Sequence, residues 1–502
     1  MRHKRRIEAT IAGAACAALT TGIIVAQEKQ KPNIILFYVD DLGWMDLGCQ
    51  GSKFYETPAI DKLASQGMRF TQGYTAHPRC LPARYAVMTG KFPARGHIFT
   101  SGNHLRSSDV TMGEAMQQGG YKTFFIGKWH LTGKDGAANL PKNRGFDVAL
   151  ACGAPGSPAT YFYPYRKVKI NQELTGDDAI GLNKEIIPDL DKGGQKGEYL
   201  TDRITDETIK FIKKQVTDNP KQPFLAYISH YGVHTPFEAK PELVKKYRKK
   251  LKNMRYEKPE YLKDSRWGGT TKMRQDNAVY AAMIESVDQS LAKIMASLSK
   301  LGIADNTIIM FSGDNGGLST RGSTTKRTLA TTNYPLRTGK GWCYEGGIRE
   351  AFIVKWPGVT KPGTVNEKDI VIGTDFYPTM LDIAGLPLRP KDHIDGESFK
   401  PALEGKNFKR TVPLFWHSPS ARPYSTGDYN CSAVREGNYK LIDWYQNNKV
   451  ELFDLSKDIG ENNDLSKSKP EITTRLLKKL RDWKKEINAE EKPLRLTKKR
   501  KK

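Results

Sequence analysis

Carboxylate and amide side chains follow two strongly apolar segments of this chain. Asp40 and Asp41 come directly after "NIILFYV", and Asp314 and Asn315 come directly after "NTIIMFSG". Ligands of open α/β sheets bind beyond the carboxyl ends of the strands, so these side chains are expected to converge. Three carboxylates and an amide favour a hard divalent cation, Ca²⁺ first and Mg²⁺ second. Either pair alone is better explained as turn chemistry, and only their combination favours a metal.

Cationic and imidazole side chains follow other strand-like segments. Lys128 and His130 lie in "GKWH" after "TFFI", His234 lies in "GVHTP", and Lys340 lies in the Gly-rich "RTGKGWCYEGGIR". Taken singly, each is more often a solvated or structural group. Together with the oxygen ligands, they would bind a small oxyanion.

The segment "HPRCLPARYAVMTG" carries Cys80 between two arginines and just before a proline. No His or second Cys stands at metal-ligand spacing from it, so a metal site of thiolate type is not indicated. Beyond the N-terminal leader the cysteines are Cys49, Cys80, Cys152, Cys343 and Cys431. This odd number indicates one cysteine with a separate purpose and leaves one or two disulfides open.

The N-terminus predicts export. "MRHKRR" followed by an apolar stretch of small residues, Ile11–Ala26, is typical of a signal peptide cut near Ala26. The alternatives are a membrane anchor, for which the stretch is short, and a lipoprotein anchored at Cys16. With 80 Lys and Arg against 55 Asp and Glu, the net charge is +25 and favours an anionic partner. Export to the periplasm or the outside makes an acidic glycan the expected anionic partner and argues against nucleic acid. We expect no stable insertion into the membrane.

Strands alternate with helices over most of the chain, which predicts an α/β sheet with helices on both faces. "FLAYISHYGVHTPF" gives a further strand, and Thr57–Gln66 and Asn277–Lys300 read as helices. After a helix within Gly373–Leu386, short antiparallel strands and a helix at about 470–487 follow. We therefore expect a signal peptide (1–26), a catalytic domain (27–405), a smaller α+β domain (406–490) and a disordered basic tail (491–502).

The chain resembles the type I sulfatases of the alkaline-phosphatase-like superfamily. The motifs that carry the resemblance are "KPNIILFYVDDLGW", "CLPARYAVMTGK", "GKWH", "VHTP", "SGDNGG", "GKGWCYEGGIR" and "ELFDLSKDIGENNDL". The resemblance is greatest to the arylsulfatase A and N-acetylgalactosamine-6-sulfatase branch. It implies a large mixed sheet flanked by helices, with a smaller C-terminal domain. Cys80 matches the cysteine of C-x-P-x-R, which a formylglycine-generating maturation enzyme oxidises to formylglycine; Ala83 stands where Ser is commonest.

The resemblance also implies an activity, the release of sulfate from a sulfated carbohydrate of galactose or N-acetylgalactosamine type. A formylglycine gem-diol at residue 80 would attack the sulfur of a calcium-bound sulfate. The implied calcium ligands are Asp40, Asp41, Asp314, Asn315 and residue 80. Arg84 would hold the gem-diol, and Lys128 and Lys340 would clamp the sulfate. His234 would protonate the leaving alcohol, and His130 would act as base when sulfate is released.

Other interpretations stay open. The chain is alternatively a phosphate or phosphonate ester hydrolase of the same superfamily, or an inactive glycan-binding relative. The basic segment Glu242–Trp267 reads equally as a solvated helical face followed by a loop, or as a rim that recruits a polyanion. Trp267 and Trp342 would stack on sugar rings or belong to the core.

Overall fold

The computed structural model describes residues 30–99, 104–153, 156–165, 187–190, 193–263, 268–446 and 448–489. The predicted signal peptide, Trp267 and the predicted basic tail lie outside the described residues. Within the described residues, no helix combines the length and the apolar character that a membrane crossing requires.

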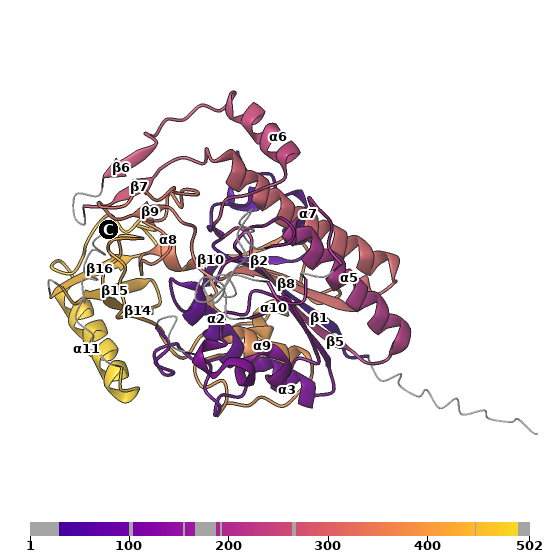
Figure 1. The fold of residues 1–502 in the computed structure, drawn as a ribbon. Coiled ribbons are helices and arrows are strands. Elements are labelled where there is room, and N and C mark those ends of the chain that lie inside the picture. Colours follow the sequence, from indigo (N-terminus) through magenta and orange to yellow (C-terminus); the bar gives the residue numbers. More distant parts are fainter. Residues whose placement is uncertain are drawn as a thin grey trace, which may run out of the picture. The chain divides into compact units, whose positions relative to one another are not determined.

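A mixed sheet runs through the centre of the fold in the order β11-β2-β10-β8-β1-β5-β3-β4, with β12 also paired to β2 (Figure 1). Its strands are β1 (Asn33–Val39), β2 (Met68–Tyr74), β3 (Lys122–Gly127), β4 (Val148–Leu150), β5 (Phe224–His230), β8 (Thr307–Gly313), β10 (Arg349–Lys355), β11 (Thr364–Asn366) and β12 (Val371–Ile372). The central strands are wholly buried, as their continuous apolar runs predict. The predicted large mixed sheet is confirmed.

Parallel pairing brings the ends of the central strands to one level. Val39 at the end of β1 lies opposite His230 of β5 and Gly313 of β8. Gly127 at the end of β3 lies opposite Ser229. The segments that follow these strands therefore begin side by side at one edge of the sheet.

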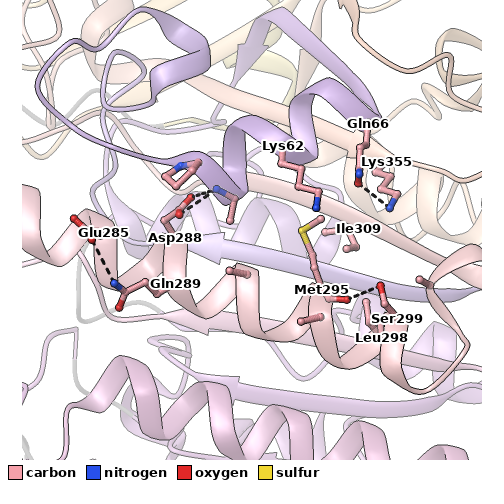
Figure 2. A pocket seen from close by; sticks show the side chains of 15 residues that line it. Lys62, Gln66, Glu285, Asp288, Gln289, Met295, Leu298, Ser299, Ile309 and Lys355 are labelled. Carbon is pink, nitrogen blue, oxygen red and sulfur yellow. Dashed lines mark hydrogen bonds between the residues drawn. The ribbon is translucent and has the colours of Figure 1, made fainter.

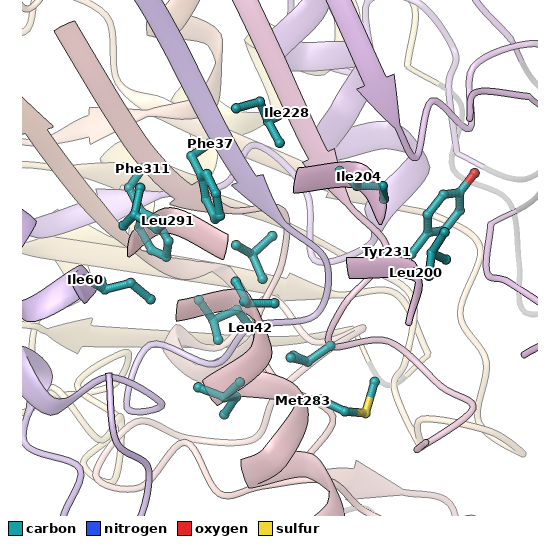
Figure 3. Packing of buried hydrophobic residues seen from close by; sticks show 14 of the residues in the cluster. Phe37, Leu42, Ile60, Leu200, Ile204, Ile228, Tyr231, Met283, Leu291 and Phe311 are labelled. Carbon is teal, nitrogen blue, oxygen red and sulfur yellow. The ribbon is translucent and has the colours of Figure 1, made fainter. Parts of the chain in front are cut away.

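Helices cover both faces of the sheet. One face carries α1 (Pro58–Gln66), α5 (Leu200–Asp218), α6 (Pro241–Leu251) and α7 (Ala278–Lys300), and the other carries α2 (Cys80–Thr89), α3 (Met112–Gln118), α9 (Phe376–Ile383) and α10 (Lys400–Leu403). Alternate β1 residues enter the two cores, since Phe37 packs in the first and Leu36 in the second. Figure 3 shows Phe37 beside Phe311 and Leu291 in the first core.

The C-terminal part forms its own antiparallel sheet, β13 (Leu414–Ser418), β14 (Cys431–Glu436), β15 (Tyr439–Trp444) and β16 (Lys449–Asp454). The long amphipathic helix α11 (Pro470–Glu486) packs on it through Leu476, Leu480 and Trp483. This smaller α+β part matches the prediction. Because Tyr74 and Phe92 of the larger part belong to the same core cluster, the division at residue 405 stays a prediction.

Short elements complete the described fold. A small sheet joins β6 (Tyr261–Lys263), β7 (Thr270–Lys272) and β9 (Thr320–Arg321), and α8 spans Glu345–Ile348. Single 3₁₀ turns occupy Gly48–Gln50, Gly133–Asn139, Pro141–Asn143, Ala304–Asn306 and Gly373–Asp375.

Candidate active site

Two carboxylates and a cysteine meet at the carboxyl edge of the sheet. Asp40 follows β1, Asp314 follows the neighbouring β8, and Cys80 is the first residue of α2. One side-chain ligand atom of each lies within 4.8 Å of the other two. Asp40 and Asp314 are fully buried, and Cys80 is 9% exposed.

Asp41 and Asn315 join the same group. Asp41 adopts a left-handed conformation with φ 58°, which turns the chain sharply after β1. Its backbone N–H donates to Asp314 Oδ1 at 3.0 Å, and Asn315 Nδ2 donates to Asp41 Oδ1 at 2.8 Å. The structure therefore brings all four predicted oxygen ligands together.

The oxygen atoms at this edge fit a divalent cation. Asp40 Oδ1 and Asn315 Oδ1 are buried acceptors that receive no hydrogen bond within the described residues. A buried acceptor without a donor is costly, and a cation would satisfy both oxygens. Carboxylate and amide oxygens are the donors that Ca²⁺ and Mg²⁺ prefer. Their role as ligands stays a prediction.

Three buried cations lie against the three carboxylates. Lys128 Nζ is 2.5 Å from Asp40 Oδ2, and Lys340 Nζ forms an ion pair with Asp41 Oδ1. Arg84 donates to Asp314 Oδ2 from Nη2 at 2.7 Å and from Nε at 2.9 Å. The site therefore gathers positive charge around its carboxylates, as binding of an oxyanion requires.

Burial and these cations compete in setting the pKa values of the carboxyl groups. Burial raises the pKa of Asp40 despite Lys128, and burial with the Asp40 charge raises the pKa of Asp314 to about 6. Burial also opposes ionisation of Asp41, but Lys340 and His234 hold its pKa well below the usual range. Neighbouring carboxylates at this edge thus repel one another, and a bound divalent cation would relieve that repulsion.

Cys80 stands among these charges. Burial raises the pKa of its thiol, but the charges of Lys128 and Lys340 outweigh burial and lower the pKa below its ordinary value. Arg84, one helical turn further along α2, also donates from Nη1 to Lys128 O at 2.9 Å and to Ser229 Oγ at 2.6 Å. Cys49, Cys80, Cys152, Cys343 and Cys431 are all free thiols in the structure.

Two of the predicted imidazoles face the same site. His234 Nε2 lies 3.6 Å from Asp41 Oδ2, while its Nδ1 is 2.7 Å from the carbonyl oxygen of Thr235. Burial lowers the pKa of His234 to about 4 against the opposing Asp41 charge. Burial and the Lys128 charge place the pKa of His130 well below its usual range. A third imidazole, His230 at the end of β5, lies in the core, with Nε2 at 3.1 Å from Ser290 Oγ.

Comparison with known proteins decides the family. The family model "Sulfatase" matches residues 32–386, and the model "N-sulphoglucosamine sulphohydrolase, C-terminal" matches residues 338–486. The chain belongs to the sulfatase family. The resemblance stated from the motifs is therefore confirmed.

Similar proteins cover most of this sulfatase. A "Sulfatase" of Formosa agariphila is 31% identical over 91% of this chain and 89% of its own length. The N-acetylgalactosamine-6-sulfatase of Mus musculus is 30% identical over 88% of this chain and 78% of its own length. The crystal structure of Ps i-CgsB in complex with k-i-k-neocarrahexaose matches with a TM-score of 0.70 at 30% identity, covering 90% of this chain and 93% of that one.

The basic segment after His234 begins with the helix α6, which has one buried face and one exposed face. Its helix α6 turns Leu243, Val244 and Tyr247 inward. Lys246 and Lys250 form ion pairs with Glu56, and Lys246 also pairs with Glu285 of α7. The predicted helical face is confirmed, and a recruiting role is left to its other, exposed basic residues.

Trp342 is a core residue. Its ring is 4% exposed and lies stacked on Tyr344 and close to Trp444. Of the two interpretations for this tryptophan, the structure supports packing rather than contact with a sugar ring.

A cavity of about 540 Å³ lies elsewhere in this sulfatase, between α1 and α7. Figure 2 shows Lys62, Asp288, Gln289 and Met295 along its walls. None of the predicted site residues lines it. The chemistry is therefore expected at the carboxyl edge of the sheet and not in this cavity.

Three groups at the site escaped prediction from the sequence. Ser229 receives a hydrogen bond from Arg84, and Asp428 forms an ion pair with Arg79, the residue before Cys80. The backbone N–H of Arg422 donates to Asp428. Ser229 had a weak signal, since it lies near the end of the buried strand β5. Asp428 and Arg422 come from a turn-rich segment without a motif.

Proposed function

We propose that this sulfatase releases sulfate from a sulfated carbohydrate of galactose or N-acetylgalactosamine type. The observation that carries the proposal is the position of Cys80, buried between oxygen ligands and two lysines whose charges lower its pKa. Similar proteins are named for such substrates, including an N-acetylgalactosamine-6-sulfatase. The alternative within the superfamily is a phosphate or phosphonate ester hydrolase, and the assay described below distinguishes the two activities.

The nucleophile in this proposal is residue 80 in its formylglycine form. A maturation enzyme would oxidise the Cβ of Cys80 to an aldehyde, with loss of the sulfur and gain of one oxygen. Water adds to the aldehyde, so residue 80 carries two hydroxyl groups. One would attack the sulfur of the substrate and lose its proton, the bond between that sulfur and the sugar oxygen would break to release the alcohol, and the sulfate would become attached to residue 80. Arg84, fixed by Asp314 and Ser229, would hold the hydroxyl groups in place.

Four oxygen ligands would hold the metal ion, namely Asp40, Asp41, Asp314 and Asn315. A bound divalent cation, Ca²⁺ first, lowers the pKa of a neighbouring hydroxyl group and neutralises sulfate oxygens. Lys128 and Lys340 would bind the remaining sulfate oxygens, because both ammonium groups act electrostatically on residue 80. Such fixed charges stabilise a transition state in which negative charge develops on oxygen.

The two histidines would transfer protons in separate steps. Because Nδ1–H donates to the Thr235 carbonyl, the Nε2 that faces the site carries a proton only in the imidazolium form. His234 would therefore donate a proton to the leaving alcohol only after the charge of a bound sulfate has raised its pKa from about 4. His130 would then remove the proton of the second hydroxyl of residue 80. The bond between Cβ of residue 80 and the sulfate oxygen would then break, so that the aldehyde re-forms and sulfate leaves.

The test measures free sulfate and free phosphate from a panel of sulfated and phosphorylated sugars. Wild-type protein and the Cys80→Ala variant are both produced together with a formylglycine-generating enzyme. We expect sulfate release from wild type only, with glycan binding retained in the variant. Full sulfate release by Cys80→Ala would contradict the proposal, and release of phosphate alone would favour the alternative.

We also propose that the protein is exported to the periplasm or the outside, where it would meet such glycans.

A further inference from the structure

A turn-rich segment of the C-terminal part borders the catalytic residues. We call residues 420–428 the rim segment. Its Asp428 forms an ion pair with Arg79, the residue before Cys80, and Arg79 Nη1 also donates to Ser420 O at 2.6 Å. On the opposite side, a Cβ on Gly341 would lie 2.7 Å from Asp428 Oδ1. The rim segment therefore packs directly against the chain on both sides, next to Cys80 and next to Lys340.

Arg422 is the exposed cation of the rim segment. Its backbone N–H donates to Asp428 Oδ2 at 3.2 Å, which fixes its position, and its side chain is exposed. Within the described part of the chain, the Arg422 guanidinium forms no ion pair. Its place beside residue 80 follows from Asp428, which accepts from the Arg422 backbone and pairs with Arg79, the residue before Cys80. Desolvation and the Arg79 charge lower the pKa of Arg422, and Cys80 opposes this.

A second arginine lies beside it. Arg327 also lowers the pKa of Arg422, and its Nη1 donates to Ser425 Oγ of the rim segment at 3.1 Å. Arg327 likewise forms no ion pair among the residues described. Since Asp428 is already paired with Arg79, the rim segment supplies no free carboxylate to the guanidinium groups of Arg422 and Arg327.

Two adjacent arginines held by a fixed backbone repel each other unless an anion lies between them. A guanidinium group offers paired N–H donors that match the oxygens of a sulfate or a carboxylate. A solvated arginine on a mobile loop would need no such explanation. Arg422, however, is anchored through Asp428 to the residue preceding the nucleophile.

We propose that Arg422, with Arg327 beside it, binds a second anionic group of the substrate next to the sulfate that is removed. The preferred substrate then carries two anionic groups near one another, the second being a sulfate or a carboxylate. This inference rests on the proposed sulfatase reaction and narrows its substrate class.

The experiment compares three matched oligosaccharides that carry the same scissile sulfate. The neighbouring position is neutral in the first, sulfated in the second and a uronate carboxylate in the third. kcat/KM for sulfate release is measured for wild type, Arg422→Ala, Arg422→Lys and Arg327→Ala. Arg481→Ala is the control, because Arg481 is an exposed arginine on α11.

We expect wild type to prefer one of the two dianionic substrates. Arg422→Ala should lower kcat/KM on that substrate by roughly tenfold to a hundredfold, the usual range for a lost hydrogen bond to a charged group. The neutral-neighbour substrate should change less than twofold, and Arg422→Lys should recover part of the loss. The dianionic substrate that wild type prefers identifies the second anionic group as a sulfate or a carboxylate.

An equal loss on all substrates, or no preference in wild type, would overturn the inference while leaving the proposed function intact. Absence of sulfate release from every substrate by wild type would instead overturn the proposed function. Thermal unfolding of each variant is recorded, so that a change confined to one substrate is not confused with misfolding.

Discussion

At the scale of single residues, Arg84 connects three groups of the site. It binds Asp314 through two nitrogens and donates to Lys128 O and Ser229 Oγ. Burial alone would lower its pKa, but Asp314 and Asp40 outweigh burial and keep Arg84 charged. We expect Arg84→Ala to leave Asp314 buried without its partner.

The first prediction therefore concerns stability and activity of Arg84→Ala together. Breaking a buried ion pair from one side costs about 3–5 kcal/mol in the free energy of unfolding. Sulfate release should fall at least a hundredfold. Ser229→Ala removes one neutral hydroxyl group, which accepts from Arg84 and donates to Lys128 O, and should cost less, about 1–2 kcal/mol, measured by urea unfolding of both variants. Equal stability of Arg84→Ala and wild type would contradict the account.

The second prediction concerns the metal ligands. Ca²⁺ should raise the thermal unfolding temperature of the wild-type protein, because a ligand that binds only the folded state stabilises it. The Asp40→Asn and Asp314→Asn variants should lose most of that rise. Calorimetry with and without a chelator measures both effects. A rise that is as large in both variants as in wild type would place calcium elsewhere.

Much of the residue scale could be predicted, because the candidate ligands directly follow apolar runs that end at one edge of the sheet. The ion pair of Asp428 with Arg79 could not, since these residues are 349 positions apart and neither lies in a motif with a fixed spacing. Arg422 escaped for the same reason. Its importance depends on which distant segments of the chain pack beside it in the fold.

At the scale of elements, α1 depends on a side chain from α7. Asp288 accepts hydrogen bonds from the backbone N–H groups of Ala59 and Ile60, at 2.9 and 2.8 Å, and so caps the beginning of α1 (Figure 2). Burial raises the pKa of Asp288 to about 6 although both backbone hydrogen bonds oppose this. Its proton is therefore kept more firmly in the folded state than in the unfolded state.

The third prediction follows from the sign of that shift. Between pH 3.8 and about 6, the unfolded chain loses the Asp288 proton while the folded protein retains it. The contribution of Asp288 to stability thus falls as the pH rises through this window, by at most about 3 kcal/mol. Asp288→Asn keeps an acceptor and should remove this pH-dependent part. Urea unfolding of both proteins at several pH values tests it, and an identical pH slope would contradict it.

Elements with strong sequence patterns were predictable, and those that depend on distant partners were not. The helix predicted for Asn277–Lys300 is α7, with Asn277 as its N-cap, and the short antiparallel strands expected after it include the hairpin of β14 and β15. The short strands β6, β7 and β9 lack apolar runs. They are strands because they pair with one another, which no local pattern indicates.

At the scale of the whole molecule, the net charge of +25 is expected to attract polyanionic substrates. The fourth prediction is that KM for a polymeric sulfated glycan rises severalfold between low salt and about 0.5 M NaCl. A small monosulfated substrate should show a much weaker change, because it meets only the buried charges, which salt screens little. The test measures KM for both substrates at increasing NaCl concentrations. An equal change in the two KM values would mean that the surface charge plays no part in recruiting the polymer.

The central claim is that residue 80 acts as formylglycine in the active enzyme. The most direct test is mass spectrometry of the peptide that carries Cys80, taken from protein that releases sulfate in the same preparation. We predict a peptide lighter than the cysteine form, reactive with a hydrazide, in an amount that follows the sulfate-releasing activity. A fully active preparation in which residue 80 is still a thiol would contradict the account.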